Sequence, residues 1–240
     1  MKNKGETMQT ELATTGAQVP QTMSVFSAAD QIDATDISIP RLKIMQTNSD
    51  LVKEDKAKAG SIIDPETHEV FGHKSEKPFE FVVLASRKYW LENVNGAWRS
   101  IPANTKYDLP WSEPGIERTF FHSFMVIPKK DMAEKNSFLM PYQLSFSSTG
   151  LNTVSTISKV ILQGKAMAGK PSYAYYFKGE IVLRKKGTNS WYQLQVTKGA
   201  DLTAKELERI ASIPTAMYIE ASRKTDVYDS KGLTNAEGEY

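Results

Sequence analysis

The pattern of apolar and polar positions predicts a chain built mainly of β-strands. Short runs rich in β-branched and aromatic residues, several of them alternating with polar residues, are separated by segments of glycine, proline, asparagine and serine, which favour turns. The runs that share this pattern are residues 37–44, 79–93, 118–128, 142–147, 173–186 and 191–198. We expect each of them to form a strand.

Two tight connections are predicted between strands. Asp64-Pro65 suits a turn, because proline fixes the φ angle of a turn's second position, so Ile62 and Val70 are expected on the two arms of a hairpin. Asn95-Gly96 is a pair favoured in two-residue hairpin turns, and the chain should return along residues 98–101. A longer hairpin turn is expected over residues 187–190.

Two helices interrupt this pattern. Residues 149–168 carry apolar side chains at a spacing close to 3.6 and follow a Ser-Ser-Thr-Gly cluster suited to capping. Thr203 and Glu206 have the spacing of a capping box, with Leu202 and Leu207 placed as a hydrophobic staple. A helix should therefore begin at Ala204 and end or bend before Pro214.

Strands in meander order around one embedded helix predict a mainly β fold with minor α content. We expect an OB-like antiparallel barrel, with an embedded helix and a C-terminal helical extension, at residues 37–223. A β-sandwich with peripheral helices is the alternative. Residues 1–36 are rich in Thr, Gln, Ala and Ser and predict a flexible N-terminal arm, and residues 224–240 predict a flexible acidic tail.

Composition narrows the class of protein. A chain of 240 residues is long enough to bury a sizeable core without a metal or disulfide. Because it has no cysteine, cysteine zinc sites and thiol nucleophiles are excluded. The N-terminal residues lack the apolar core of a secretory signal, and no apolar run is long enough to span a bilayer. We therefore expect a cytoplasmic protein without membrane association.

Charge is unevenly distributed, although the formal net charge is only +2. Residues 151–200 hold eight lysines and arginines against Glu180 alone, a net charge of +7. Residues 226–240 are net acidic, at −3. The protein therefore has a basic segment and an acidic end, although its net charge alone predicts no partner.

Catalytic chemistry finds little support in the sequence. The histidines His68, His73 and His122 lack the spacing of a helical zinc pair, and no phosphate-binding loop or nucleophile elbow is present. His122 alternates with phenylalanines in a predicted strand, which favours a structural role. We predict a non-enzymatic protein with no cofactor and no metal, and keep a carboxylate-metal enzyme as the least favoured alternative.

Aromatic and basic residues are interleaved on predicted strands. Unpaired bases stack on flat aromatic rings while lysine and arginine contact the phosphate backbone, so this combination is typical of single-stranded nucleic-acid binding. The predicted stacking residues are Tyr89, Trp90, Trp98, Tyr176 and Trp191. The predicted phosphate contacts are Arg87, Lys88, Arg99, Lys178, Arg184, Lys185 and Lys186.

Packing is the alternative explanation for the same residues. Strand aromatics often belong to the core, and Trp90 and Trp98 could pack as a cross-strand pair. In the Tyr173 segment, alternation places Tyr173, Tyr175 and Phe177 on one face, predicted to pack, with Tyr176 and Lys178 on the other. Lys185 and Lys186 could equally mark a solvated hairpin tip.

The segments IPRLKIMQTNSDLVKEDKAKAGSIID, KYWLEN, PYQLSFSSTGLNTVSTISKVI and NSWYQLQV resemble tailed-phage single-stranded-DNA-binding proteins with an OB-type fold. The resemblance covers about residues 38–198. It implies that bases lie across a barrel face and that an acidic C-terminal tail recruits replication proteins. The tail here, ending in Glu237, Glu239 and Tyr240, is less acidic than the resemblance leads one to expect.

Together these observations predict a phage protein of the host cytoplasm that coats single-stranded DNA without sequence readout during replication or recombination, with RNA as an alternative ligand. The alternative function is a phage structural or assembly protein whose β-barrel or sandwich domain packs against other subunits. A DNA binder should gather rings and cations along a groove, whereas an assembly protein should present a broad apolar patch.

Overall fold

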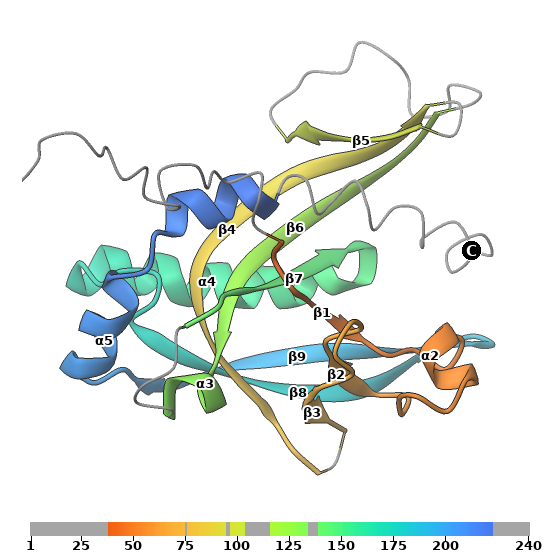
Figure 1. Cartoon of the computed structure of the whole chain (residues 1–240), viewed down its shortest axis with the longest axis horizontal. Helices are drawn as coiled ribbons and strands as arrows, with labels where there is room; N and C mark the ends of the chain where they lie inside the picture. The colour runs from red at the N-terminus through yellow and green to blue at the C-terminus, as the bar shows by residue number, and fades with distance from the viewer. Residues whose placement is uncertain (1–37, 75, 95–96, 104–115, 134–138, 223–240) are drawn as a thin grey trace, which may run out of the picture. The chain divides into compact units, whose positions relative to one another are not determined.

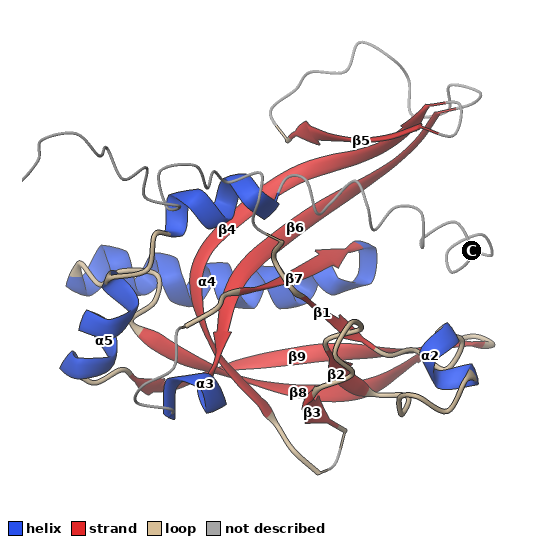
Figure 2. Cartoon of the chain, in the orientation of Figure 1, coloured by secondary structure: helices blue, strands red, loops and turns tan. Residues whose placement is uncertain are grey.

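The computed structural model describes residues 38–74, 76–94, 97–103, 116–133 and 139–222, all within one compact unit, Asp33–Tyr240. The predicted N-terminal arm and the acidic tail lie outside the described residues. The described part is mainly β, a curled half-barrel sheet with a few helices (Figures 1 and 2).

The sheet follows the order β3-β2-β1-β7-β6-β4-β8-β9, and β5 pairs with the outer part of β4. β1 and β7 are parallel, and the other pairs are antiparallel. The strands are β1 (Arg41–Ile44), β2 (Ser61–Ile63), β3 (Val70–His73), β4 (Phe79–Val94), β5 (Ala97–Pro102), β6 (Ile116–Pro128), β7 (Tyr142–Ser147), β8 (Tyr175–Lys186) and β9 (Asn189–Asp201). The helices are α2 (Asp50–Lys53), α3 (Lys129–Ala133), η1 (Ser148–Gly150), α4 (Leu151–Ala168) and α5 (Ala204–Ala211), followed by a helix over residues 215–222.

β4 separates two apolar cores because both of its faces are covered. Phe79, Phe81 and Val83 point into the half-barrel, where Val154 and Ile157 of α4 join them. The alternate residues of β4 point to a second core under α3, α5 and helix 215–222. A register shift between Val83 and Ala85 marks a β-bulge at the point where β4 leaves both cores and continues as an arm with β5 and β6.

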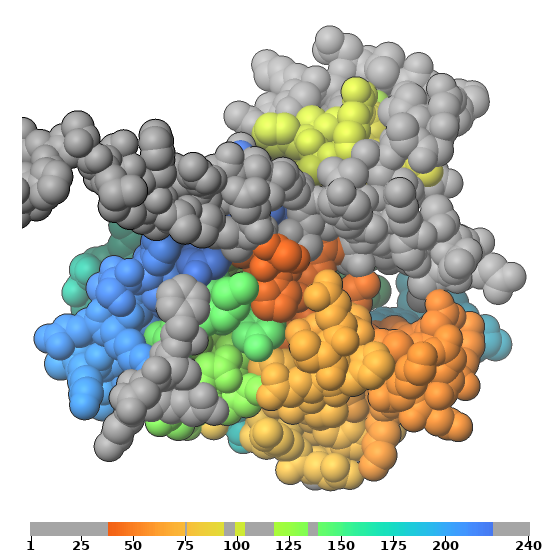
Figure 3. Space-filling view, in the orientation of Figure 1, coloured from red at the N-terminus to blue at the C-terminus, as the bar shows by residue number. Residues whose placement is uncertain are grey.

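The second core is closed by the C-terminal helices. Thr203 and Glu206 form the predicted capping box at the start of α5, and Arg209 in its last turn donates from Nη1 to the Met132 carbonyl of α3 at 3.0 Å. Figure 3 shows the blue surface of α5 and helix 215–222 on the same face as the green surface of α3. The helical extension therefore packs as a layer over the sheet.

A side chain helps to close the half-barrel between β1 and β9. Gln46, just after β1, accepts from the Tyr192 backbone N–H at 2.7 Å and donates to the Tyr192 carbonyl at 2.9 Å. Thr153 of α4 donates to the Leu194 carbonyl. Side chains thus bond the backbone of β9 at these positions as a neighbouring strand would.

The structure confirms the predicted strands and helices and corrects several details. The tip of the last hairpin is shorter than expected, because the strands continue to Lys186 and Asn189 and only Gly187 and Thr188 turn the chain. Gly187 has φ +60, which glycine adopts without strain. The Ser-Ser-Thr-Gly cluster supplies no side-chain cap to α4, because it winds into η1 instead.

Two predicted aromatic arrangements are wrong. The register sets Trp98 opposite Asn93 and Trp90 opposite Ile101, so the two tryptophans are not cross-strand partners. Along β8, Tyr175, Tyr176 and Phe177 are all buried, so both faces of this segment are packed. Alternation alone predicted one packed face, but the helical layer covers the other.

Candidate nucleic-acid interface

The β8–β9 hairpin brings a ring and cations together on one face. Arg184 lies directly opposite Trp191 in the strand register, and Lys186 lies opposite Asn189. Because side chains alternate along a strand, Arg184, Lys186 and Trp191 share one face, which is opposite to the face of the core residues Ile181 and Leu194. We call this the outer face of the hairpin.

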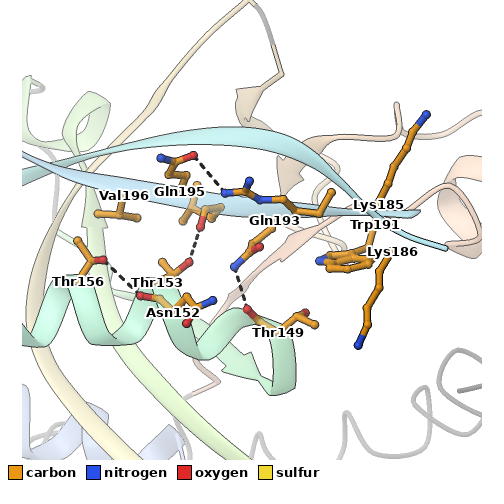
Figure 4. Close-up of a pocket in the computed structure, with 12 residues that line it drawn as sticks. Thr149, Asn152, Thr153, Thr156, Lys185, Lys186, Trp191, Gln193, Gln195 and Val196 are labelled. Atoms are coloured by element: carbon orange, nitrogen blue, oxygen red, sulfur yellow. Dashed lines mark hydrogen bonds between the residues drawn. The ribbon is translucent and has the colours of Figure 1, made fainter. Parts of the chain in front are cut away.

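Lys185 lies on the other side. Figure 4 shows the Trp191 ring beside Lys186, whereas Lys185 extends in the opposite direction from the strand. Leu183 and Lys185 alternate with Arg184 and Lys186, so this arrangement follows from the strand geometry. The structure therefore separates two lysines that the sequence treats as equivalent.

A groove of about 640 Å³ runs between β9 and the first turns of α4. We call it the hairpin groove; it is lined by Thr149, Asn152, Thr153, Thr156, Arg184, Lys185, Lys186, Trp191, Gln193, Leu194, Gln195 and Val196. Gln193 donates from Nε2 to the Thr149 carbonyl at 2.8 Å, and Arg184 donates from Nη2 to Gln195 Oε1 at 3.5 Å (Figure 4). These contacts hold the polar floor of the groove in place.

The electrostatics of the hairpin groove favour an anion. Its described lining contains one arginine and two lysines and no carboxylate. Lys178, farther down the same face of β8, differs because Glu180 Oε1 lies 3.1 Å from its Nζ. The indole Nε1 of Trp191 is buried and has no hydrogen-bond partner among the described residues. The cations of this face that lack a neighbouring carboxylate therefore lie toward the hairpin tip.

A second group of predicted residues lies on the arm formed by β4, β5 and β6. Lys88 and Trp90 share one face of β4, and the Trp90 ring meets the edge of Phe120 with centroids 5.1 Å apart. Arg99 is on the same face of β5, where its side chain is 65% exposed. The Trp98 backbone belongs to β5, but its side chain lies outside the described part.

Arg99 is bound to a buried carboxylate. Glu92 is fully buried and accepts from Arg99 Nε and from Arg118 Nε, each at 2.7 Å. Burial alone would raise the pKa of Glu92, but the hydrogen bonds from Arg118 and Arg99 outweigh it and hold the pKa below its ordinary value. The Glu92 cluster, as we call these three residues, ties β5, β4 and β6 together and carries a net charge of +1.

Three predicted contacts are not accessible as expected. Tyr89 is 4% exposed, stacked on Phe121 at 5.5 Å with the Arg87 guanidinium over its ring, so Tyr89 cannot stack on a base in this conformation. Arg87 also donates from Nη2 to the Ser222 carbonyl at 3.4 Å, so its guanidinium is engaged in contacts within the protein. Tyr176 is 5% exposed and donates to Glu206 Oε1 at 2.7 Å in the second core. The helical layer, which alternation does not reveal, buries Tyr176.

His122 has the structural role that its pattern predicts. It is 4% exposed and stacks on Phe124 with centroids 4.6 Å apart. Burial, reinforced by the positive charge of Lys88, lowers the pKa of His122 to about 4. Across the described ranges, no group of three or more histidine, aspartate or glutamate residues is placed to hold a metal ion.

Sequence reasoning missed the polar lining of the hairpin groove. Gln193 and Gln195 alternate with Leu194 and Val196, so the strand pattern already places them on the same face as Trp191. Asn152 and Thr156 join them only because α4 packs beside β9, and no local pattern gives that contact.

The fold and site define a mainly β protein with a half-barrel sheet and a basic, ring-bearing hairpin groove. A family model described as Pam3 phage gp34-like protein matches residues 12–95, about a third of the chain. This similarity supports a phage origin; it spans β1 to β4 and does not reach the β8–β9 hairpin. Comparison with curated proteins and with solved structures gives no match. Among the described helices, none is long and apolar enough to cross a membrane.

Proposed function

We propose that this phage protein binds single-stranded DNA without sequence readout, through the outer face of the β8–β9 hairpin. The observation that carries the proposal is the placement of Trp191 beside Arg184 and Lys186 in an open groove whose described lining has no carboxylate. We infer a role in coating strands exposed during phage replication or recombination, in the host cytoplasm and without enzymatic activity.

The residue types of the hairpin groove suit unpaired bases. An indole offers a flat surface on which any base can stack, worth about 1–3 kcal/mol per base, and the two cations on its face can contact the adjoining phosphates. Gln193, Gln195 and Asn152 offer amide groups that can adapt to different base edges. A duplex has no exposed base faces, so it could use only the cations.

The order of strands supports an OB-type barrel. β4, β6 and β7 form a meander, α4 follows, and β8 returns to pair with β4 before β9 completes the hairpin. In OB folds the loops after the first and the fourth strands contact oligonucleotides. Their counterparts here are the arm, with Lys88, Trp90 and Arg99, and the β8–β9 tip.

The described surface gives less support to a role in assembly. Leu151 and Leu162 are exposed large apolar residues of α4, but Ser155 and Ser158 lie between them on the same helical face. An interface between subunits would favour a continuous apolar surface.

We expect the protein to bind a fluorescent thymidylate oligomer more tightly than a duplex of equal length. Stacking is available only on the single strand, whereas charge attracts both ligands. Fluorescence polarisation at matched salt measures the two affinities, and a uridylate oligomer tests RNA in the same assay. Equal affinity for single strand and duplex would remove the stacking argument and leave only nonspecific attraction.

Variants of the hairpin separate stacking from charge. Trp191→Ala should weaken binding by about 1–3 kcal/mol with little change in salt dependence, because a ring releases no counterions. Lys186→Ala should weaken binding and reduce the slope of log K against log salt by about 0.7, the value for one phosphate contact on a single strand. Both quantities come from polarisation titrations at several salt concentrations.

Lys185→Ala is the comparison variant, because Lys185 also lines the groove but extends from β8 in the direction opposite to Trp191 and Lys186. It should change affinity and slope less than Lys186→Ala does. Circular dichroism should first establish that each variant is folded. A folded Trp191→Ala protein with wild-type affinity would show that the hairpin is not the stacking surface.

A further inference from the structure

A second groove opens where β1 and β7 diverge. The two strands pair only through Arg41 with Gln143 and Leu42 with Leu144, and β1 then leads to Gln46, which bonds to β9. The space between the diverging ends is a groove of about 560 Å³. We call it the wedge groove; Lys43, Gln46, Phe121, Ser145 and Ser147 are among its lining residues.

The wedge groove and the hairpin groove adjoin each other. Thr149, Gln193 and Leu194 line both of them. The hydrogen bond from Gln193 Nε2 to the Thr149 carbonyl therefore lies at their junction (Figure 4).

The chemistry of the wedge groove matches that of the hairpin groove. Its described lining includes the cationic residues Arg41 and Lys43 and one carboxylate, Asp50. Phe121 supplies a half-buried ring, held in position by stacking on Tyr89. Ser147 of β7 adds a hydroxyl suited to sugar and phosphate oxygens, whereas the Ser145 hydroxyl is already bonded to Ser123 and Gln143.

We propose that the two grooves form a single track for one nucleic-acid strand, which runs from Trp191 past Gln193 into the wedge groove and there contacts Lys43. This inference rests on the proposed function and extends it, because it assigns a second binding segment and makes the ligand a strand of several nucleotides. Single OB folds occupy about 4–16 nucleotides, and a track through both grooves belongs above the lower end of that range.

The test compares short and long ligands. Thymidylate oligomers of about 4 and about 12 nucleotides span the range of OB site sizes. Lys43→Ala should weaken binding of the longer oligomer roughly threefold to tenfold and leave the shorter one nearly unchanged, because a short ligand can be held by the hairpin groove alone. Trp191→Ala should weaken both. Lys159→Ala, an exposed lysine of α4 that lines neither groove, is the matched control.

A second measurement needs no variant. A long oligomer carrying one 5-bromodeoxyuridine near either end, irradiated on the wild-type protein, should crosslink to peptides of both grooves, including residues 43–46 or 121. Crosslinks confined to residues 184–195, or equal affinities of wild type and Lys43→Ala for the long oligomer, would overturn the track while leaving the proposed function intact. Absence of binding to any oligomer would overturn both.

Discussion

Replacing Glu92 with alanine should destabilise the protein by about 3 kcal/mol, because the change leaves two arginines facing each other with no carboxylate between them. Most of the lost stability comes from Arg118, because its side chain is only 7% exposed and its charge cannot easily reach water. Glu92 is also the middle member of a register-matched set, opposite Arg99 on β5 and Arg118 on β6. Urea unfolding followed by circular dichroism measures the loss.

Arg99→Ala provides the comparison for this cluster. Arg99 is largely exposed, so its removal should cost only about 1 kcal/mol, and Arg118 keeps its bond to Glu92. Glu92→Gln preserves the shape but not the charge and should fall between the two. An unfolding free energy of Glu92→Ala within about 1 kcal/mol of wild type would mean that the cluster adds little to the stability of the arm.

Acidification should destabilise the protein through His122. The pKa of His122 in the folded protein is about 4, below the ordinary value near 6.5, so between these values the unfolded chain binds a proton that the folded protein does not. Stability therefore falls as pH drops through this window, by as much as about 3 kcal/mol in total. Urea unfolding at pH values across the window measures the trend.

His122→Gln isolates this contribution. Glutamine does not titrate, so the variant should lose most of the pH dependence in the window, while His68 and His73 remain in both proteins. Glu92 should contribute only at lower pH, because its pKa lies below the usual carboxylate value and its stabilising effect is lost only as pH falls through that lowered value. Identical pH profiles for wild type and His122→Gln would contradict the assignment.

The strands and helices could be predicted because local patterns dominate them. The alternation in residues 142–147, the capping box at Thr203 and the period of residues 149–168 each rest on side chains close in sequence. The mainly β class followed from counting such elements. The second core could not be predicted, because Tyr176 is buried by helices that follow it in sequence and pack on the outer face of β8.

The sequence predicted which residues could form the candidate site, but not which of them share an accessible face. Sequence reasoning named Arg184, Lys186 and Trp191, which share a face, but it also named Tyr89, which Phe121 covers from another strand. The strand register decides whether Lys185 or Lys186 lies on the same face as the Trp191 ring. The register in turn depends on the length of the turn at Gly187. The wedge groove arises from strands far apart in sequence, so no single segment indicates it.

The hydrogen bonds of Gln46 and Thr153 limit how two copies of the protein can meet. An exposed strand edge invites a second chain to add a strand of its own. The N–H and carbonyl of Tyr192 are already bonded to Gln46, and the Leu194 carbonyl is already bonded to Thr153. A second copy of the protein therefore cannot extend the sheet edge to edge at this part of β9, so any contact between copies must use other surfaces.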